Sequence, residues 1–373
     1  MRLNKLSFLL ISLMCLSLIS CGSNDSKESV EYQDEIDLNI QYQSKLFLEQ
    51  HPQQLYQDSI KSVVSVIAFD DGNTPAVGSG FFCMEDEQYL YLITNHHVVE
   101  NSSTVKVISY LGQVKVATVL GVDSVFDVAL LRTEKFEDIK LVKFPNEDYT
   151  KIENPNPGDE VFIIGNPGAL ENIGTVNIGV VSGADRDPFA ISSSFERADF
   201  AISVDITMNH GNSGGPLFNM NGEVIGINTY AATTINGVSY KGLNFSLPIQ
   251  DALLIVSKIK EEGEFLRATL GYNLYIASRD LTLYEKQYLK LDSNFQEGIV
   301  VKGFGTNNIL EVPLYSIITK VNGVSVNNLA EFRRQLYFAG PNTNVKISYY
   351  QFSEKGYDFY EREIVVQPKS LSI

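Results

Sequence analysis

Residues 211–216 read Gly-Asn-Ser-Gly-Gly-Pro and separate two segments rich in β-branched residues. A serine hydroxyl is a weak nucleophile at neutral pH, so it needs a neighbouring base and N–H donors for the negative oxygen that its attack creates. Glycines on both sides let the backbone turn so that the N–H groups of Gly211 and Ser213 converge. The pattern therefore predicts a nucleophilic Ser213 and an oxyanion hole made by these two N–H groups. A glycine-rich hairpin with an exposed serine is the alternative.

Two motifs that could activate this serine precede it in the chain. Residues 94–99, Thr-Asn-His-His-Val-Val, follow an apolar run, and residues 127–131, Asp-Val-Ala-Leu-Leu, open another. The order His, Asp, Ser is that of a chymotrypsin-type triad, in which the imidazole takes the serine proton and the carboxylate fixes its tautomer. From the residues alone, His96 and His97 compete for the role of base, and Asp123 is an alternative acid to the one at residue 127.

The composition favours a β-rich globular protein with two domains. The 373 residues are 44% hydrophobic and 20% charged, and they include 19 Tyr, 21 Phe and 27 Gly. Aromatic residues are enriched in strands, and this length exceeds what one compact domain usually needs. With 45 acidic and 29 basic residues the formal charge is −16. A nucleic-acid-binding protein carries a basic surface instead, so we expect no nucleic-acid partner.

The N-terminus predicts export and a lipid anchor. Residues 1–20 combine a positively charged start with an apolar run and a small residue before Cys21. This is the pattern of a secretory signal. The apolar run of roughly 14 residues is too short for a membrane-spanning helix, which needs roughly 20. Its end resembles a bacterial lipobox, which implies cleavage before Cys21 and lipidation of its sulfur; an ordinary signal peptide is the alternative. Residues 21–54 are polar and acidic, which predicts a flexible tether.

The remaining chain divides into two predicted domains. Residues 55–263 contain short β-branched and aromatic runs separated by Gly, Asn and Asp, which predict an all-β domain. This domain ends in a helix after Pro248, which Gly263 terminates. Residues 266–368 combine strand-like runs with a helix over 328–339. That helix begins with a capping box of Asn328 and Glu331 and ends before Gly340.

Together these motifs resemble the HtrA/Deg peptidases of the DegP and DegS type. The resemblance covers residues 55–368 and rests on TNHHVV, DVALL, PGDEVFIIGNPGAL, TVNIGVVSG and NHGNSGGPLFNMNGEVIGINT. It implies a mostly β protein with a chymotrypsin-like double β-barrel, whose active site lies in the cleft between the barrels, followed by a PDZ-like α+β domain. It also implies a homotrimer or a multiple of one.

The resemblance selects the members of the triad. The family pattern T-x-x-H-V places the base at His97, and D-x-A-L-L places the acid at Asp127, which leaves Asp123 to a turn. His97, Asp127 and Ser213 are then the catalytic residues.

The substrate pocket is expected to be lined by Thr207, Met208, Ile227, Asn228 and Thr229. The residue six before the nucleophile lines the base of the primary pocket in chymotrypsin-like folds. It is Thr207 here, so the base of the pocket has no carboxylate that would select a Lys or Arg side chain of the substrate. Met208 matches an apolar position of the family and favours small aliphatic side chains; a role as core filler is the alternative. The backbone of residues 226–229 is expected to pair with an extended substrate.

In the second domain, Leu270, Gly271 and Tyr272 stand where PDZ domains bind a C-terminal carboxylate and add the peptide as a strand. The chain departs from the family nearby. Residues 303–313 replace the usual Ser-Pro-Ala segment, and Tyr315-Ser316 replaces Gly-Asp. A degenerate domain used only for packing is therefore the alternative.

The predicted function is a serine endopeptidase of the bacterial cell envelope that cleaves unfolded or exposed segments through an acyl-enzyme, in protein quality control or stress signalling. No cofactor is expected, and no metal, because no Cys, His and Asp residues lie at ligand spacing. Expected partners are extended polypeptides, a C-terminal peptide at the PDZ-like domain and, through Cys21, a membrane, with the periplasmic side favoured. The alternative is a non-catalytic or tightly gated peptide-binding chaperone or scaffold on the same fold.

Overall fold

The computed structural model describes residues 52–70, 74–166, 173–186, 201–231, 234–235, 238–239, 244–270, 274–303, 312–353 and 356–368. The predicted signal segment, Cys21 and most of the predicted tether lie outside these residues. Within them, no helix is both long and apolar enough to cross a membrane.

A first closed barrel has the strand order β1-β2-β3-β6-β5-β4, and all its neighbouring strands are antiparallel. Alternate residues of each strand fill its interior, among them Val66, Phe82, Leu92 and Leu131, which are all fully buried. The short helix α4 (His96–Val99) follows β3. The strands are β1 (Val63–Phe69), β2 (Ala76–Glu85), β3 (Tyr89–Thr94), β4 (Thr104–Ser109), β5 (Val114–Asp123) and β6 (Val128–Glu134).

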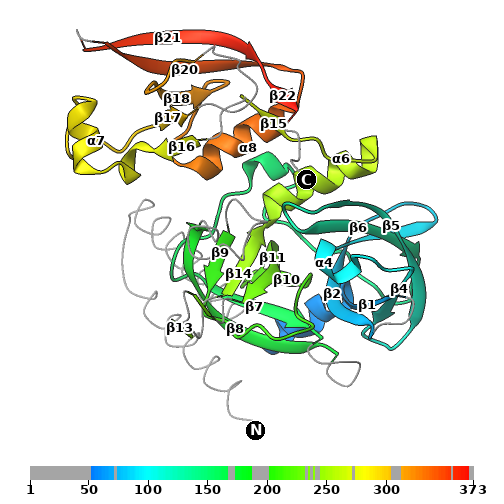
Figure 1. Ribbon diagram of the computed structural model, residues 1–373. Coiled ribbons are helices and arrows are strands. Elements are labelled where there is room, and N and C mark those ends of the chain that lie inside the picture. The colour runs from blue at the N-terminus through cyan, green and yellow to red at the C-terminus, as the bar shows by residue number, and fades with distance from the viewer. Residues whose placement is uncertain are drawn as a thin grey trace, which may run out of the picture. The chain divides into compact units, whose positions relative to one another are not determined.

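A second closed barrel has the order β10-β11-β14-β9-β8-β7 (Figure 1, green). Its interior is an aliphatic cluster that includes Ile163, Ile202 and Leu217. The strands are β7 (Glu160–Gly165), β8 (Thr175–Arg186), β9 (Ala201–Val204), β10 (Pro216–Asn219), β11 (Val224–Ala231) and β14 (Asn244–Pro248), and a separate short pair is formed by β12 (Thr234–Ile235) and β13 (Val238–Ser239).

The outer faces of the two barrels share one hydrophobic cluster. It takes Phe81 and Ile93 from the first barrel and Phe162 and Phe218 from the second. The rings of Phe162 and Phe218 stack with their centroids 4.8 Å apart. The thiol of Cys83 belongs to the same cluster, and burial raises its pKa to about 12.

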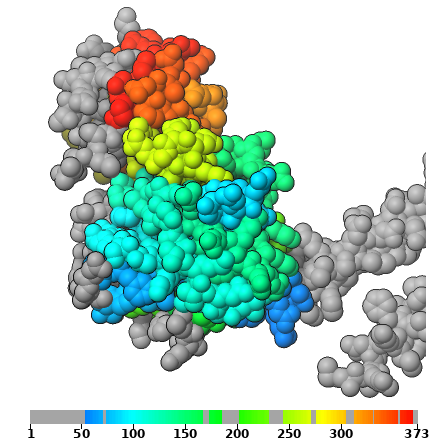
Figure 2. All heavy atoms as spheres, turned by 90° about the vertical axis from the view of Figure 1, so that its right-hand side faces the viewer, coloured from blue at the N-terminus to red at the C-terminus, as the bar shows by residue number. Residues whose placement is uncertain are grey.

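Helix α6 (Ile249–Glu262) packs its apolar side onto this shared cluster through residues such as Ile255 and Ile259. Its outer side, yellow-green in Figure 2, lies at the molecular surface. Gly263 ends the helix in a left-handed conformation, with φ of 86°, and its N–H donates to the carbonyl of Ile259. The predicted helix and its glycine stop are therefore confirmed.

The C-terminal part contains a sheet of order β16-β17-β18-β20-β21 with β19 beside β18, and a separate pair of β15 with β22. Its hydrophobic core is distinct from that of the barrels and contains Phe332 and Leu336 of helix α8. The elements are β15 (Ala268–Thr269), β16 (Leu274–Ala277), α7 (Leu283–Tyr288), β17 (Ile299–Gly303), β18 (Ile317–Val321), β19 (Val324–Ser325), α8 (Leu329–Ala339), β20 (Asn344–Ser353), β21 (Gly356–Val365) and β22 (Gln367–Pro368). Elsewhere in the chain, helix α3 (Pro52–Ser59) precedes the first barrel, and short 3-10 turns lie before β1, after β6 and after β16.

Helix α8 begins as its sequence predicts, with one difference. The side chain of Asn328 accepts the N–H of Glu331 at 2.8 Å, but the carboxylate of Glu331 accepts the N–H of Asn327, at 2.7 Å, instead of that of Asn328. Gly340 follows the helix at φ of 77°. The mostly β class, the double barrel and a further α+β sheet domain are confirmed, and the exact domain boundaries stay predictions.

Candidate active site

Ser213 lies in the turn that leads into β10. Two glycines of this turn have positive φ angles, 100° at Gly211 and 82° at Gly214, a region that side chains with a Cβ rarely enter. The N–H of Gly214 donates to the carbonyl of Asn228 at 2.8 Å, and the N–H of Asn228 donates to the carbonyl of Gly215 at 2.9 Å. Strand β11 thus holds the turn, and Ser213 itself is half-buried.

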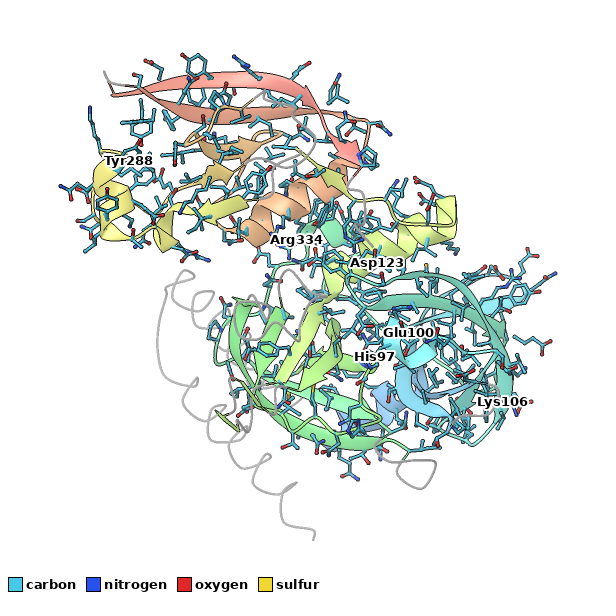
Figure 3. The ribbon with its side chains drawn as sticks, in the orientation of Figure 1. His97, Glu100, Lys106, Asp123, Tyr288 and Arg334 are labelled. Carbon is cyan, nitrogen blue, oxygen red and sulfur yellow. The ribbon has the colours of Figure 1, made fainter. Side chains whose placement is uncertain are left out.

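His97 lies on α4 (Figure 3) and contacts Asp127, which precedes β6. His97 Nδ1 is 2.6 Å from Asp127 Oδ2, and the backbone N–H of His97 donates to Asp127 Oδ1 at 2.8 Å. The Asp127 side chain is fully buried, whereas that of His97 is 35% exposed. A carboxylate at this nitrogen favours the tautomer that is protonated on Nδ1, which leaves Nε2 to accept a proton.

The backbone of Asp127 is held as firmly as its side chain. Its φ of 58° is in the left-handed region, which only short polar side chains tolerate well. Its carbonyl accepts the side-chain amide of Asn95 at 2.7 Å and the N–H of His96 at 3.2 Å. Residues 95–97 therefore bind both the backbone carbonyl and the carboxylate of Asp127.

Asp123 is the last residue of β5, just before the turn that contains Asp127, and it makes no hydrogen bond to His97 among the described residues. Its Oδ1 accepts the N–H groups of Val125 and Phe126 at 3.1 and 2.7 Å, and the side chain forms a buried ion pair with Arg267. The carboxylate closes the turn, and the residue that reaches the imidazole is Asp127.

Hydrogen bonds within the first barrel and between the two barrels bring these parts together. The N–H of Ser79 on β2 donates to the carbonyl of Ser213 at 2.8 Å, and the hydroxyl of Thr94 donates to the carbonyl of Ser79 at 2.7 Å. The side-chain amide of Asn95 also donates to Thr229 Oγ1, at 3.1 Å. Among the hydrogen bonds of the described residues, Ser213 Oγ takes part in none.

The predicted pocket residues divide into two groups. Thr207 is exposed, and the half-buried Met208 packs against the core of the second barrel. Ile227 and Asn228 are fully buried, and Thr229 is 7% exposed.

The expected pairing of residues 226–229 with a substrate needs a correction. Gly226 and Ile227 already pair with β10 and β14, and Asn228 pairs with β14 and binds the nucleophile turn. Thr229 lies at an irregularity between β11 and β14. Residues 226–228 of this strand are therefore not available to pair with a substrate, and the expectation narrows to Thr229.

At the predicted peptide site of the second domain, Leu270 is 2% exposed and belongs to the core beside α8. Gly271 and Tyr272 lie outside the described residues. Tyr315, which stands at the departure from the family pattern, has a positive φ of 61° and a ring 5.9 Å from that of Tyr288.

Two further histidines lie near the site in the sequence. His96, the alternative base, is partly buried beside His97, and His210, which directly precedes the nucleophile turn, is exposed. Nowhere in the described part of the chain do three His, Cys, Asp or Glu residues gather in a way that could hold a metal ion.

Sequence reasoning missed residues that connect the site over long distances. Ser79 and Asn166 are 87 residues apart and share a hydrogen bond, and Arg267 reaches Asp123 across 144 residues. No local pattern marks such pairs. The only signal was the position of Ser79 in a Gly-Ser-Gly triplet within a strand-like run, since glycines in a strand mark close backbone approach.

Comparisons with known proteins identify relatives of this chain. A family model described as a trypsin-like peptidase domain matches residues 78–227. The chain is 33% identical over 271 residues to the probable periplasmic serine endoprotease DegP-like of Chlamydia pneumoniae, a match that covers 72% of this chain and 51% of that protein. It is 31% identical over 263 residues to the serine protease Do-like HtrB of Bacillus subtilis strain 168, covering 69% of this chain and 56% of that protein.

The chain spans about half the length of these curated relatives. Among solved structures, the HtrA-type protease AlgW with tripeptide aligns with a TM-score of 0.66 and 23% identity, over 85% of this chain and 98% of that chain. Identity at this level shows a shared fold.

Proposed function

Because the chain belongs to the HtrA/Deg family of serine proteases, we propose that it is a serine endopeptidase that cleaves unfolded or exposed segments of other proteins. The observation that carries this proposal is the buried Asp127 carboxylate at 2.6 Å from His97 Nδ1, on the side of the first barrel that the Ser213 turn also contacts. A carboxylate in that place orients an imidazole and stabilises its protonated form.

In the proposed reaction Ser213 Oγ attacks the scissile carbonyl while His97 Nε2 takes the hydroxyl proton. The N–H groups of Gly211 and Ser213 bind the oxyanion of the tetrahedral intermediate. The intermediate collapses to an acyl-enzyme, and His97 gives its proton to the leaving amine. Water then attacks the ester with His97 again as base, which releases the acid and restores the serine.

The geometry supports an extended substrate. Along the described part of β11, backbone groups that could bind a peptide begin at Thr229, since the strand before it is paired on both sides. A folded protein rarely presents a free strand, so unfolded or exposed segments are the proposed substrates. Thr207 and the half-buried Met208 would form an uncharged pocket that suits small or medium aliphatic side chains.

We further propose an exported protein whose residues 1–20 are removed and whose Cys21 carries the lipid, on the periplasmic side of a bacterial membrane. The predicted subunit arrangement is a homotrimer, and the predicted second ligand is a C-terminal peptide at residues 270–272. The division into residues 55–263 and 266–368 belongs to the same proposal. Light scattering of a soluble form that begins at Gly22 tests the trimer, because a monomeric mass would contradict it.

Degradation of a permanently unfolded protein tests the proposed activity. The soluble form is compared with Ser213→Ala, using a reduced and alkylated substrate so that refolding cannot protect it. We expect cleavage that the variant loses completely. If both forms bind the unfolded protein and neither cleaves it, including on warming and with added C-terminal peptides, the chain is a chaperone or scaffold and the proposal is wrong.

A further inference from the structure

Ser79 contacts the nucleophile turn through two different groups. Its hydroxyl donates to the carbonyl of Gly211 at 2.6 Å, and its backbone N–H donates to the carbonyl of Ser213 at 2.8 Å. These are the two residues whose N–H groups form the proposed oxyanion hole. The side chain is fully buried, so water does not compete for these bonds.

Each contact fixes one peptide plane. The plane that joins Gly211 to Asn212 is held at its carbonyl by the Ser79 hydroxyl, and at its N–H by the carbonyl of Asn209, 3.0 Å away. The plane after Ser213 is held at its carbonyl by the N–H of Ser79. The N–H of Ser213 lies in the plane between these two, and the N–H of Gly211 lies in the plane just before them. The middle plane is also held at the carbonyl of Asn212, which accepts the N–H of Gly215 at 3.0 Å. Ser79 holds the planes on either side of the Ser213 N–H, and one of these follows directly on the plane that carries the Gly211 N–H.

The hydroxyl itself is held from the other side. It accepts the N–H of Asn166 at 3.1 Å, and the side-chain oxygen of Asn166 accepts the N–H of Gly174 at 2.9 Å. A hydroxyl that accepts this N–H directs its own proton to the remaining acceptor, the carbonyl of Gly211. Gly211, at φ of 100°, has no Cβ to resist rotation, so the turn needs such an external restraint.

We infer that Ser79 is a positioning residue that holds the N–H groups of Gly211 and Ser213 in the direction required to bind the oxyanion. This inference rests on the proposed peptidase function. Ser79 is fully buried and makes no hydrogen bond to His97 among the described residues, so it acts through the orientation of the turn.

The structure offers a matched control. Ser65 on β1 lies directly opposite Ser79 in the strand register and is 1% exposed, and its hydroxyl has no hydrogen-bond partner among the described residues. Ser65→Ala and Ser79→Ala thus remove the same group at the same depth of the same sheet, but only Ser79→Ala releases the carbonyl of Gly211.

The test measures peptide hydrolysis and inhibition by a peptide aldehyde, whose hemiacetal places an oxyanion in the hole. For Ser79→Ala we expect kcat to fall by about 10- to 100-fold, since losing one oxyanion donor outright costs about 10²- to 10³-fold. KM should change less than about threefold, and aldehyde affinity should fall by the same factor as kcat. The pH at half-maximal kcat/KM should not move, because the pair of His97 and Asp127 is untouched. Ser65→Ala should match the wild type.

Equal kcat for Ser79→Ala and Ser65→Ala would overturn the inference, and so would a loss confined to KM. If Ser79→Ala does not fold, Ser79→Cys replaces it, because a thiol has a similar shape and is a weaker donor. A lower kcat with unchanged KM then supports the inference, and wild-type kcat refutes it. Failure of the proposed function is distinguishable, because the wild type itself would then cleave nothing.

Discussion

Arg267 and Asp123 form an ion pair that is almost shielded from solvent, with side chains 3% and 4% exposed. The same carboxylate accepts the N–H groups of Val125 and Phe126, and the guanidinium lies 5.0 Å from the centre of the Phe126 ring. The pair therefore joins the segment after α6 to the turn that precedes Asp127 (Figure 3 labels Asp123).

Removing one partner of this pair should destabilise the protein strongly. Arg267→Met leaves the Asp123 charge buried without its cation, which costs about 3–5 kcal/mol of unfolding free energy. Asp123→Asn keeps an oxygen for the turn but leaves the guanidinium buried and unpaired. The double variant should lose less unfolding free energy than the two single variants lose together, and urea unfolding measures these three losses. Strict additivity would mean that the two charges do not stabilise each other.

Asp127→Asn should leave the fold intact and disable the imidazole. An amide at this position can donate to Nδ1 and so favours the wrong tautomer, which in a Ser-His-Asp triad lowers kcat by about 10⁴-fold. The thermal midpoint should stay close to that of the wild type, because the side chain keeps its shape. A loss of activity below about tenfold would show that Asp127 is not the orienting acid.

Gly214→Ala tests how closely the nucleophile turn packs against the first barrel. A Cβ at Gly214 would collide with the carbonyl of Ser79 and the hydroxyl of Thr94, and it would lie 2.9 Å from the N–H of Asn95. Gly112 is the control, because it has a similar φ of 76° and open space around it. We expect Gly112→Ala to cost about 1–2 kcal/mol, the left-handed backbone penalty alone. Gly214→Ala should unfold or inactivate the protein, and equal behaviour of the two variants would contradict the described packing.

Cys83 should be inert to alkylation in the folded protein. Burial raises the pKa of its thiol to about 12, so at pH 8.5 the reactive thiolate is scarce in the folded state and common in the unfolded one. Because the folded state holds this proton more tightly, the thiol lowers stability as pH rises above the ordinary thiol value of 9.0. In a form that begins at Gly22, Cys83 is the single cysteine, so labelling reports it alone. Modification should track urea unfolding, and fast labelling without urea would refute the burial.

Local signals explain which elements could be predicted. Helices α6 and α8 are marked by caps within a few residues of their ends, at Gly263 and at Asn328. Thr282 and Glu285 form a complete capping box at the start of α7, which is the same kind of signal. The helix was not predicted because it is too short to show a helical period of apolar residues. Strand β21 was missed because its residues are mostly exposed, so they lack the apolar alternation that marks a buried strand.

Contacts between residues far apart in the sequence could not be predicted from local patterns. Barrel closure pairs β1 with β4 and β7 with β10, and neither pairing leaves a trace in the local period. The double barrel was therefore expected only through resemblance to a family. The bonds of Ser79 to Gly211 and of Arg267 to Asp123 span 132 and 144 residues and follow from the folded arrangement alone.

Covalent labelling with a fluorophosphonate tests the central claim, that Ser213 is a nucleophile activated by His97. The soluble form is treated with the reagent, and the adduct is located by mass spectrometry of its peptides. We predict one adduct, on Ser213, absent from Ser213→Ala and formed at least about 10²-fold more slowly in His97→Ala. An adduct on another residue, or a Ser213 labelling rate that His97→Ala leaves unchanged, would contradict the account.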